Sequence, residues 1–128
     1  MEIDKRIIND SDFLKVLKLS ELRLYKDGDL AWFLLVPRVE KVIEWTDLSK
    51  ENQKILTEEI DYVCKLLKKY INPDKINIGT LGNMVPQMHV HIIGRFKTDR
   101  AWPGAVWGTK SKKSYQQYML EDWIKRIG

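Results

Sequence analysis

The chain of 128 residues is long enough for one domain with a real core and hardly long enough for two. Its 44% hydrophobic and 31% charged residues are typical of a folded protein and exclude a disordered chain. The net charge of +4 suits an anionic ligand such as a nucleotide but is too small to indicate nucleic acid. We recognise no signal peptide and no apolar run of membrane-spanning length, so we expect a single cytoplasmic domain over residues 1–128.

The first part of the chain predicts a short helix followed by a hairpin. Segment 9–20 has apolar residues at helical spacing, and a cap at its start would come from Asn9, Asp10 or Ser11. Segment 21–27 alternates apolar and polar residues as a half-buried strand does, and segment 30–37 reads as a buried strand. Asp27, Gly28 and Asp29 between them are typical turn residues. The apolar residues of the predicted helix are Phe13, Leu14 and Leu17.

A long helix is predicted from Ser49 to Tyr70, where Asn72-Pro73 ends it. Cys64 flanks its apolar face and is interpreted as a small packing residue, because no second thiol accompanies it for a disulfide or redox pair. The apolar residues on this face are Leu56, Ile60, Val63, Leu67 and Tyr70.

The last part of the chain predicts a second hairpin and a C-terminal helix. Segments 74–81 and 87–95 read as strands joined by the turn residues 82–86. From Ser114 onward, apolar residues recur every four positions, which indicates an amphipathic helix. Helices clustered beside an antiparallel sheet give an α+β fold. The helical positions are Tyr115, Met119, Trp123 and Ile127.

Both histidines of the chain lie two residues apart in the last predicted strand. On a strand, His89 and His91 would share one face with Gln87, about 7 Å apart, and could contact different atoms of one phosphate. One imidazole could attack phosphorus while the other hydrogen-bonds a phosphate oxygen or assists the leaving group. The residues expected on the opposite face are Met88, Val90 and Ile92.

Other interpretations of these residues stay open. The two histidines could be structural, and a His-x-His zinc site would need further ligands from scattered carboxylates or Cys64. Gly79 and Gly82 could let backbone N–H groups approach a phosphate, and they are equally typical of a turn. Asn77 could add a side-chain amide to a phosphate site.

The segment NIGTLGNMVPQMHVHIIGR (residues 77–95) resembles the signature of the histidine triad (HIT) superfamily of nucleotide hydrolases and transferases. Three histidines alternating with apolar residues, preceded by Asn-x-Gly and a glycine-containing phosphate loop, mark that family. The segment LAWFLLVPR is similar to the family strand that ends in Pro-Lys/Arg. The resemblance spans roughly residues 22–95 and points to bacterial Gln-x-His-x-His members of the diadenosine tetraphosphate hydrolase type. It implies an antiparallel sheet with the long helix and the C-terminal helix packed against it.

The resemblance implies a role for each matching position. His89 matches the histidine that attacks the α-phosphorus and becomes nucleotidylated, and His91 matches the one that contacts the phosphate and supports the leaving group. Asn77 and Gly82 match the asparagine and the loop at the phosphate. The other implied binding positions are Asn83, where many members have Gln; Met84, which replaces a Ser or Thr hydroxyl; and Asp27 or Asp29, near the acidic residue that binds ribose.

Gln87 replaces the first histidine of the triad. In the family, the backbone carbonyl at this position helps to hold the nucleophile's second ring nitrogen, and a carbonyl survives any substitution. The Gln87 side chain can donate or accept a hydrogen bond but cannot carry charge. We therefore expect a competent nucleophile with altered pH dependence or leaving-group choice, and loss of activity stays open.

Downstream, Trp102 and Trp107 flank Pro103-Gly104 in a loop that could close over a base, or pack on the body or on a dimer mate. The KSKK run from Lys110 is interpreted as a solvated loop, although it could meet a polyphosphate. Arg95 is a candidate phosphate contact.

The predicted function is hydrolysis or transfer of nucleotidyl groups at the α-phosphorus of dinucleoside polyphosphates or related conjugates, through a nucleotidyl-histidine at His89. We expect no protein-bound cofactor, with any divalent cation held by the substrate phosphates, and the resemblance implies a homodimer. The alternative is a nucleotide-binding or sensing module with weak or no turnover, favoured by Gln87 and Met84. A single-stranded RNA binder that stacks bases on Trp102 and Trp107 is less compatible with the modest charge.

Overall fold

An antiparallel sheet of five strands lies at the centre of the computed structural model, which describes residues 1–128. Its strands are β1 (Ser11–Val16), β2 (Ser20–Tyr25), β3 (Trp32–Pro37), β4 (Lys75–Gly79) and β5 (Val90–Arg95), in the spatial order β1-β2-β3-β5-β4. The helical segments are α1 (Lys5–Asp10), η1 (Trp45–Asp47), α2 (Lys50–Tyr70) and α3 (Gln117–Ile127). The predicted α+β fold is confirmed.

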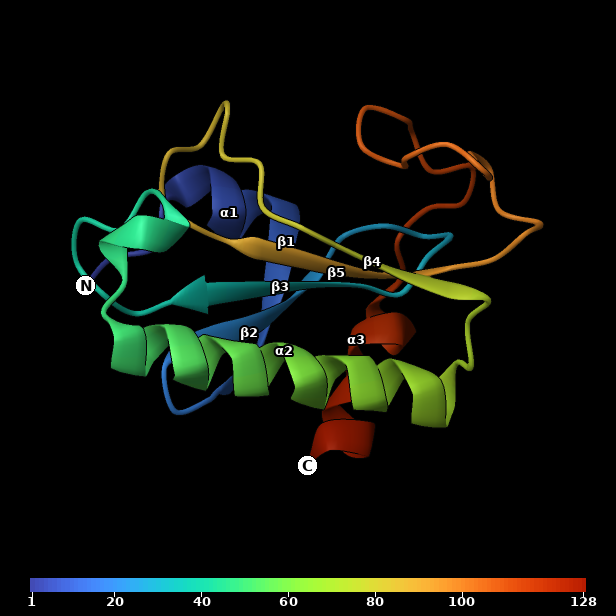
Figure 1. Ribbon diagram of the computed structural model, residues 1–128. Helices are drawn as coiled ribbons and strands as arrows, with labels where there is room; N and C mark the ends of the chain where they lie inside the picture. The colour runs from blue at the N-terminus through green and yellow to red at the C-terminus, as the bar shows by residue number, and fades with distance from the viewer.

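The sheet separates two apolar clusters. In Figure 1, α2 and α3 lie along one face of the sheet, while α1 and the long loop of residues 96–116 lie on the other. The larger cluster joins β2, β3 and β5 to α2 and α3, and includes Leu22, Phe33, Leu67, Ile92 and Trp123. The smaller cluster lies under α1 and the 96–116 loop and includes Ile7, Trp32, Leu34, Ile93 and Val106. Both faces of β3 and β5 are therefore buried, and any site on them must be lined by residues that tolerate burial.

Both predicted hairpins and both of the later helices are confirmed. β2 pairs with β3, and β5 pairs with both β3 and β4. Ser49 caps α2 by accepting a hydrogen bond from the Asn52 N–H at 3.1 Å. The last strand begins at Val90 rather than at Gln87, because the Met88 N–H bonds to the carbonyl of Val42, outside the sheet. The C-terminal helix begins at Gln117, a little after the predicted Ser114.

The predicted helix over residues 9–20 is wrong. The helix of this region is α1, which lies earlier in the chain and is capped by the Asp4 side chain, an acceptor for the Arg6 N–H. Residues 11–16 instead form β1, the edge strand that pairs with β2. A register shift between Phe13 and Lys15 marks a bulge in this strand, which disturbs the period of two and leaves an apolar spacing that resembles a helix. Leu14 packs into the larger cluster, while Phe13 is 49% exposed.

Cys64 packs against the larger cluster, and burial raises the pKa of its thiol, which agrees with a packing role. No helix of the fold is both long and apolar enough to cross a bilayer.

Glu59 is a buried carboxylate of α2 that fixes the turn between β1 and β2. It accepts hydrogen bonds from the N–H of Leu19 at 2.8 Å and of Ser20 at 3.2 Å. We expect Glu59→Ala to lower the free energy of unfolding by about 2–3 kcal/mol, because both N–H groups lose a charged acceptor. Urea unfolding of this variant and of Glu58→Ala, an exposed neighbour, measures the difference. Equal losses in the two variants would contradict this role of Glu59.

Candidate functional site

The two histidines lie at the start of β5 on the sheet face that carries α1. Their side chains are almost completely buried, with 8% of His89 and 7% of His91 exposed, and their ring centroids are 5.0 Å apart. Met88, Val90 and Ile92 point into the larger cluster on the opposite face, as the strand period predicts. The sequence prediction of two neighbouring imidazoles on one face is therefore confirmed.

The His89 ring is held by the backbone of Gln87. Its Nδ1 lies 2.8 Å from the Gln87 carbonyl oxygen. A carbonyl can only accept a hydrogen bond, so Nδ1 carries the proton and the lone pair of the neutral ring lies on Nε2. The carbonyl of His89 itself accepts a hydrogen bond from the Thr80 hydroxyl at 2.9 Å, which fixes the backbone on the other side of the ring. Nε2 of His89 is thus available as a nucleophile.

The His91 ring is held by an indole. The Trp32 Nε1–H donates to Nδ1 of His91 at 2.9 Å. An indole N–H can only donate, so Nδ1 is unprotonated and the proton of the neutral ring lies on Nε2. Burial, with a smaller contribution from the nearby His89 charge, lowers the pKa of His91 to about 3. The two histidines are therefore opposite tautomers: His89 presents an acceptor nitrogen and His91 presents an N–H donor.

Trp107 from the 96–116 loop closes one side of this pair. Its ring meets His91 edge-on with centroids 5.5 Å apart, and it also contacts Trp32 at 6.2 Å. A Cβ at Gly79, which pairs with His91 across the sheet, would come within 3.1 Å of the Trp107 ring. The absence of a side chain at Gly79 therefore lets the Trp107 ring lie close to β4, and a larger residue would push the ring outward. The sequence alone suggested only a turn or a phosphate contact for this glycine. Trp107 therefore packs on the body of the domain, against Trp32 and His91.

A cleft of about 360 Å³ opens beside His91. Its lining combines aromatic side chains with basic and hydroxyl-bearing ones, so it suits an anionic ligand with an aromatic part. Trp107 lines this cleft, and its Nε1–H is buried and has no hydrogen-bond partner. The lining includes Tyr25, Lys26, Trp32, His91, Trp107 and Lys110.

The β4–β5 loop (residues 80–89) lies beside α1 at the end of the sheet where the histidines sit (Figure 1). Gly82 has φ of +72°, a conformation that favours glycine. Asn83 is exposed, and Met84 is 82% exposed with no polar atom that could replace a hydroxyl donor. The side-chain amide of Gln87 is hydrogen-bonded to the N-terminal segment, not to either histidine.

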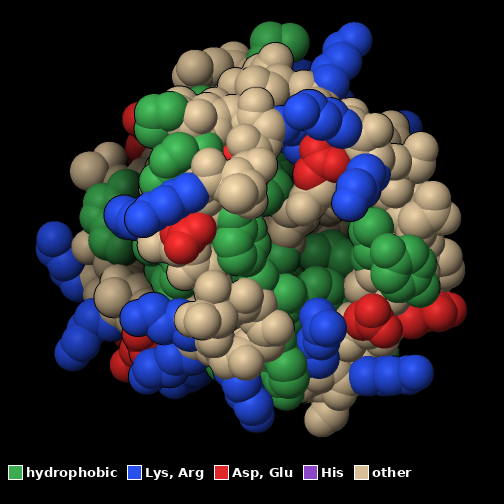
Figure 2. Space-filling model, turned by 90° about the vertical axis from the view of Figure 1, so that its right-hand side faces the viewer, with side chains coloured by type: hydrophobic (Ala, Val, Ile, Leu, Met, Phe, Trp, Pro, Cys, Tyr) green, Lys and Arg blue, Asp and Glu red, His purple; other side chains and the backbone are tan.

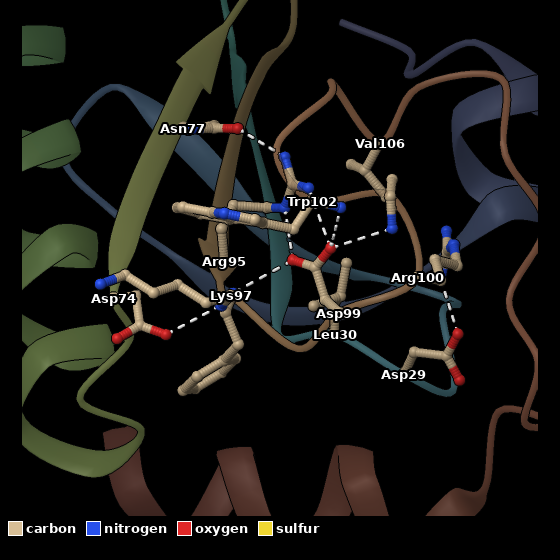
Figure 3. A network of polar contacts seen from close by, with 12 residues as sticks. Asp29, Leu30, Asp74, Asn77, Arg95, Lys97, Asp99, Arg100, Trp102 and Val106 are labelled. Atoms are coloured by element: carbon tan, nitrogen blue, oxygen red, sulfur yellow. Dashed lines mark hydrogen bonds and ion pairs between the residues drawn. The ribbon is translucent and has the colours of Figure 1, made fainter.

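Asn77 and Arg95 lie on the histidine face of the sheet but are joined to each other. The Asn77 Oδ1 accepts from Nη1 of Arg95 at 2.8 Å, and the Arg95 guanidinium makes a buried ion pair with Asp99 at 2.7 Å (Figure 3). Arg95 holds the pKa of the Asp99 carboxyl well below its usual range. Arg95 is only 2% exposed and is already bonded within the chain, which does not favour the phosphate contact predicted for it. Its role is to fix the start of the 96–116 loop, where Trp102 lies against the guanidinium.

Asp27 and Asp29 are both bound to Arg100, at 2.8 and 2.9 Å. Asp27 also accepts hydrogen bonds from the backbone N–H groups of Asp29 and Leu30, and Arg100 donates to both of its carboxylate oxygens. Four hydrogen bonds to the Asp27 carboxylate are therefore already made within the chain. This arrangement does not favour the ribose contact that the resemblance implied. The ion pairs instead tie the β2–β3 turn to the loop that carries Trp107. Arg100 and Asp99 were missed in the sequence because an Asp-Arg pair in a polar loop carries no signal of burial.

Charge is dispersed at the end of the molecule that carries the 96–116 loop. Figure 2 shows the end of the molecule that carries the 96–116 loop, where Lys and Arg side chains are scattered among other residues and do not form a continuous stripe. No three His, Cys, Asp or Glu side chains lie close enough together to hold a metal ion.

Comparison with known proteins places the chain. A family model described as HIT domain matches residues 6–98. A histidine triad protein from Bradyrhizobium japonicum is 37% identical, with 98% of this chain and 94% of that chain covered and a TM-score of 0.93. A histidine triad protein from Marinobacter aquaeolei VT8 is 32% identical, with 98% and 92% covered and a TM-score of 0.92. No curated protein matches the sequence.

A hypothetical histidine triad nucleotide-binding protein from Sulfolobus tokodaii strain7 has a TM-score of 0.70 over 94% of this chain and 85% of that one. At 20% identity it shows a common fold alone. The matching region, residues 6–98, includes all five strands, the β4–β5 loop and both histidines. The chain therefore belongs to the HIT domain family.

Proposed function

We propose that the chain hydrolyses or transfers nucleotidyl groups, with His89 as the nucleophile. Proteins with this domain generally bind nucleotides and act on nucleotide substrates, and some members are not catalytic. The observation that carries the proposal is the pair of opposite tautomers. A site that must attack phosphorus and stabilise the resulting charge needs one free lone pair and one adjacent N–H, and the Trp32 and Gln87 contacts favour that pairing.

The chemical steps follow from this assignment. The His89 Nε2 lone pair forms a bond to the α-phosphorus while the bond from phosphorus to the leaving-group oxygen breaks. The His91 Nε2–H donates to a phosphoryl or leaving oxygen, and backbone N–H groups of the β4–β5 loop bind the phosphate in place of a side chain at Met84. Water then attacks the phosphorus, breaks the N–P bond and releases a nucleoside monophosphate.

We propose dinucleoside polyphosphates, such as diadenosine tetraphosphate, as the substrate class. The cleft beside His91 supports this choice, because it combines aromatic walls with Lys26 and Lys110. Any divalent cation would be bound by the substrate phosphates. We also propose that the protein is a homodimer in the cytoplasm. The homodimer is supported by the sheet edge at β4, which is paired only with β5 and carries Ile78 at 51% exposure.

The first test is turnover of diadenosine tetraphosphate by the native protein, His89→Ala and His91→Ala. We expect AMP from the native protein, no detectable adduct or AMP from His89→Ala, and a rate lower by about 10²–10³-fold in His91→Ala, because one donor to the developing charge is lost. Separation of the nucleotides measures turnover, and calorimetry measures the binding of AMP. Tight AMP binding without turnover by the native protein would instead favour the sensing module.

Trp32 is expected to act through His91. Trp32→Phe removes the indole N–H, so both neutral tautomers of His91 become accessible and kcat should fall by roughly tenfold, with a smaller change in AMP affinity. Trp45→Phe, a change at a 42% exposed tryptophan, is the matched control. Steady-state kinetics of the two variants are compared. An unchanged kcat in Trp32→Phe would rule out tautomer control by the indole.

A neutral His91 also makes stability depend on pH. The pKa of His91 is about 3 in the folded protein, whereas its ordinary value is 6.5, so below pH 6.5 the unfolded chain takes up a proton that the folded chain does not. The contribution of His91 to the free energy of unfolding is nearly constant above pH 6.5, and it becomes destabilising as the pH falls from 6.5 toward 3. From pH 7 to 5 this loss should be about 1–2 kcal/mol. Urea unfolding at both values should show a smaller loss in His91→Asn, and an equal loss would contradict the shift.

A further inference from the structure

We propose that Gln87 is a positioning residue whose side chain fastens the N-terminal segment (residues 2–6) to the β4–β5 loop and thereby fixes the carbonyl that orients His89. Its effect on catalysis rests on the proposed function, whereas the fastening itself does not. Gln87 stands where the triad signature has a histidine, and its side chain is bonded to the N-terminal segment and not to His89 or His91.

The Gln87 amide bonds to the backbone of two residues far away in the sequence. Its Oε1 accepts from the Asp4 N–H at 2.7 Å, and its Nε2 donates to the Glu2 carbonyl at 3.1 Å. The carboxamide therefore pairs with the chain as a neighbouring strand would, with one donor and one acceptor side by side. The same residue uses its own carbonyl to hold Nδ1 of His89 at 2.8 Å.

A second set of hydrogen bonds, through Arg6, also joins the N-terminal segment to the β4–β5 loop. The Asp4 carboxylate accepts from Nε and Nη2 of Arg6 at 3.0 and 2.9 Å, and Nη1 of Arg6 donates to the Met84 carbonyl at 2.8 Å. The N-terminal segment is thus hydrogen-bonded to the β4–β5 loop at two residues, Met84 and Gln87. The β4–β5 loop that is fastened in this way carries the backbone groups expected to meet the phosphate.

Only a carboxamide of this length matches the geometry. In an amide the donor and acceptor share one carbon and point the same way, whereas the two nitrogens of an imidazole diverge across a ring. A histidine at position 87 could satisfy one of the two backbone partners but would leave the other unpaired. Asparagine keeps the amide but is one methylene shorter. It therefore tests whether the length of the side chain matters in addition to its amide group.

The test compares Gln87→Ala, Gln87→Asn and Gln87→His with Gln116→Ala, an exposed glutamine without a side-chain hydrogen bond. Amide hydrogen exchange is followed at Asp4 and Arg6, and kcat and KM are measured with diadenosine tetraphosphate. We expect exchange at Asp4 to be at least about tenfold faster in all three Gln87 variants. We expect kcat to fall by roughly 10- to 100-fold with KM changed much less, because the nucleophile is misplaced and not removed.

The outcomes are distinguishable. Faster exchange together with lower kcat in all three variants, and neither effect in Gln116→Ala, supports the proposal. A Gln87→His protein that is as active as the native one or more active overturns it, because the position would then act as a triad histidine. Unchanged exchange at Asp4 overturns the fastening even if the native protein is an active hydrolase. If the native protein turns over no nucleotide, the proposed function fails, and faster exchange in the variants still supports the fastening.

Discussion

Burial of two imidazoles on one sheet face is the constraint around which this site is organised. A buried ring nitrogen without a partner is costly, so each Nδ1 must be paired. The partners have opposite polarity: a carbonyl for His89 and an indole N–H for His91. That difference alone converts two chemically identical side chains into an acceptor and a donor. Charge plays little part, because burial lowers the pKa of His91 to about 3.

Two buried ion-pair clusters hold the walls of the site in place. Removing such charges from water is expensive, and a pair is retained only when its remaining hydrogen-bonding capacity is satisfied. Arg95 meets this condition through Asp99, Asn77 and the Gly104 carbonyl, and Arg100 meets it through Asp27 and Asp29. Both pairs fasten the 96–116 loop to the sheet. The loop can therefore present Trp107 to His91 without a helix or strand of its own.

The sequence predicted what depends on local periodicity. The strand period of β5 placed both histidines on one face, and the spacing along α2 with its Ser49 cap predicted that helix almost residue by residue. The helix predicted over residues 9–20 was wrong, because a bulge in β1 disturbs the strand period and leaves apolar residues at a helix-like spacing. The sequence also could not identify Trp32 as a partner of His91, since the two are 59 positions apart and only the pairing of β3 with β5 joins them.

Position 87 shows why a motif does not determine the role of each of its residues. The backbone carbonyl of Gln87 contacts His89 whatever the side chain is, so the nucleophile places no demand on that side chain. The side chain is then free to take another role, and here it binds the backbone of residues 2 and 4. The position carries no ionisable side chain, and it connects the N-terminal segment to the β4–β5 loop instead. In the proposed reaction, donation to the leaving group therefore falls to the Nε2–H of the neutral His91.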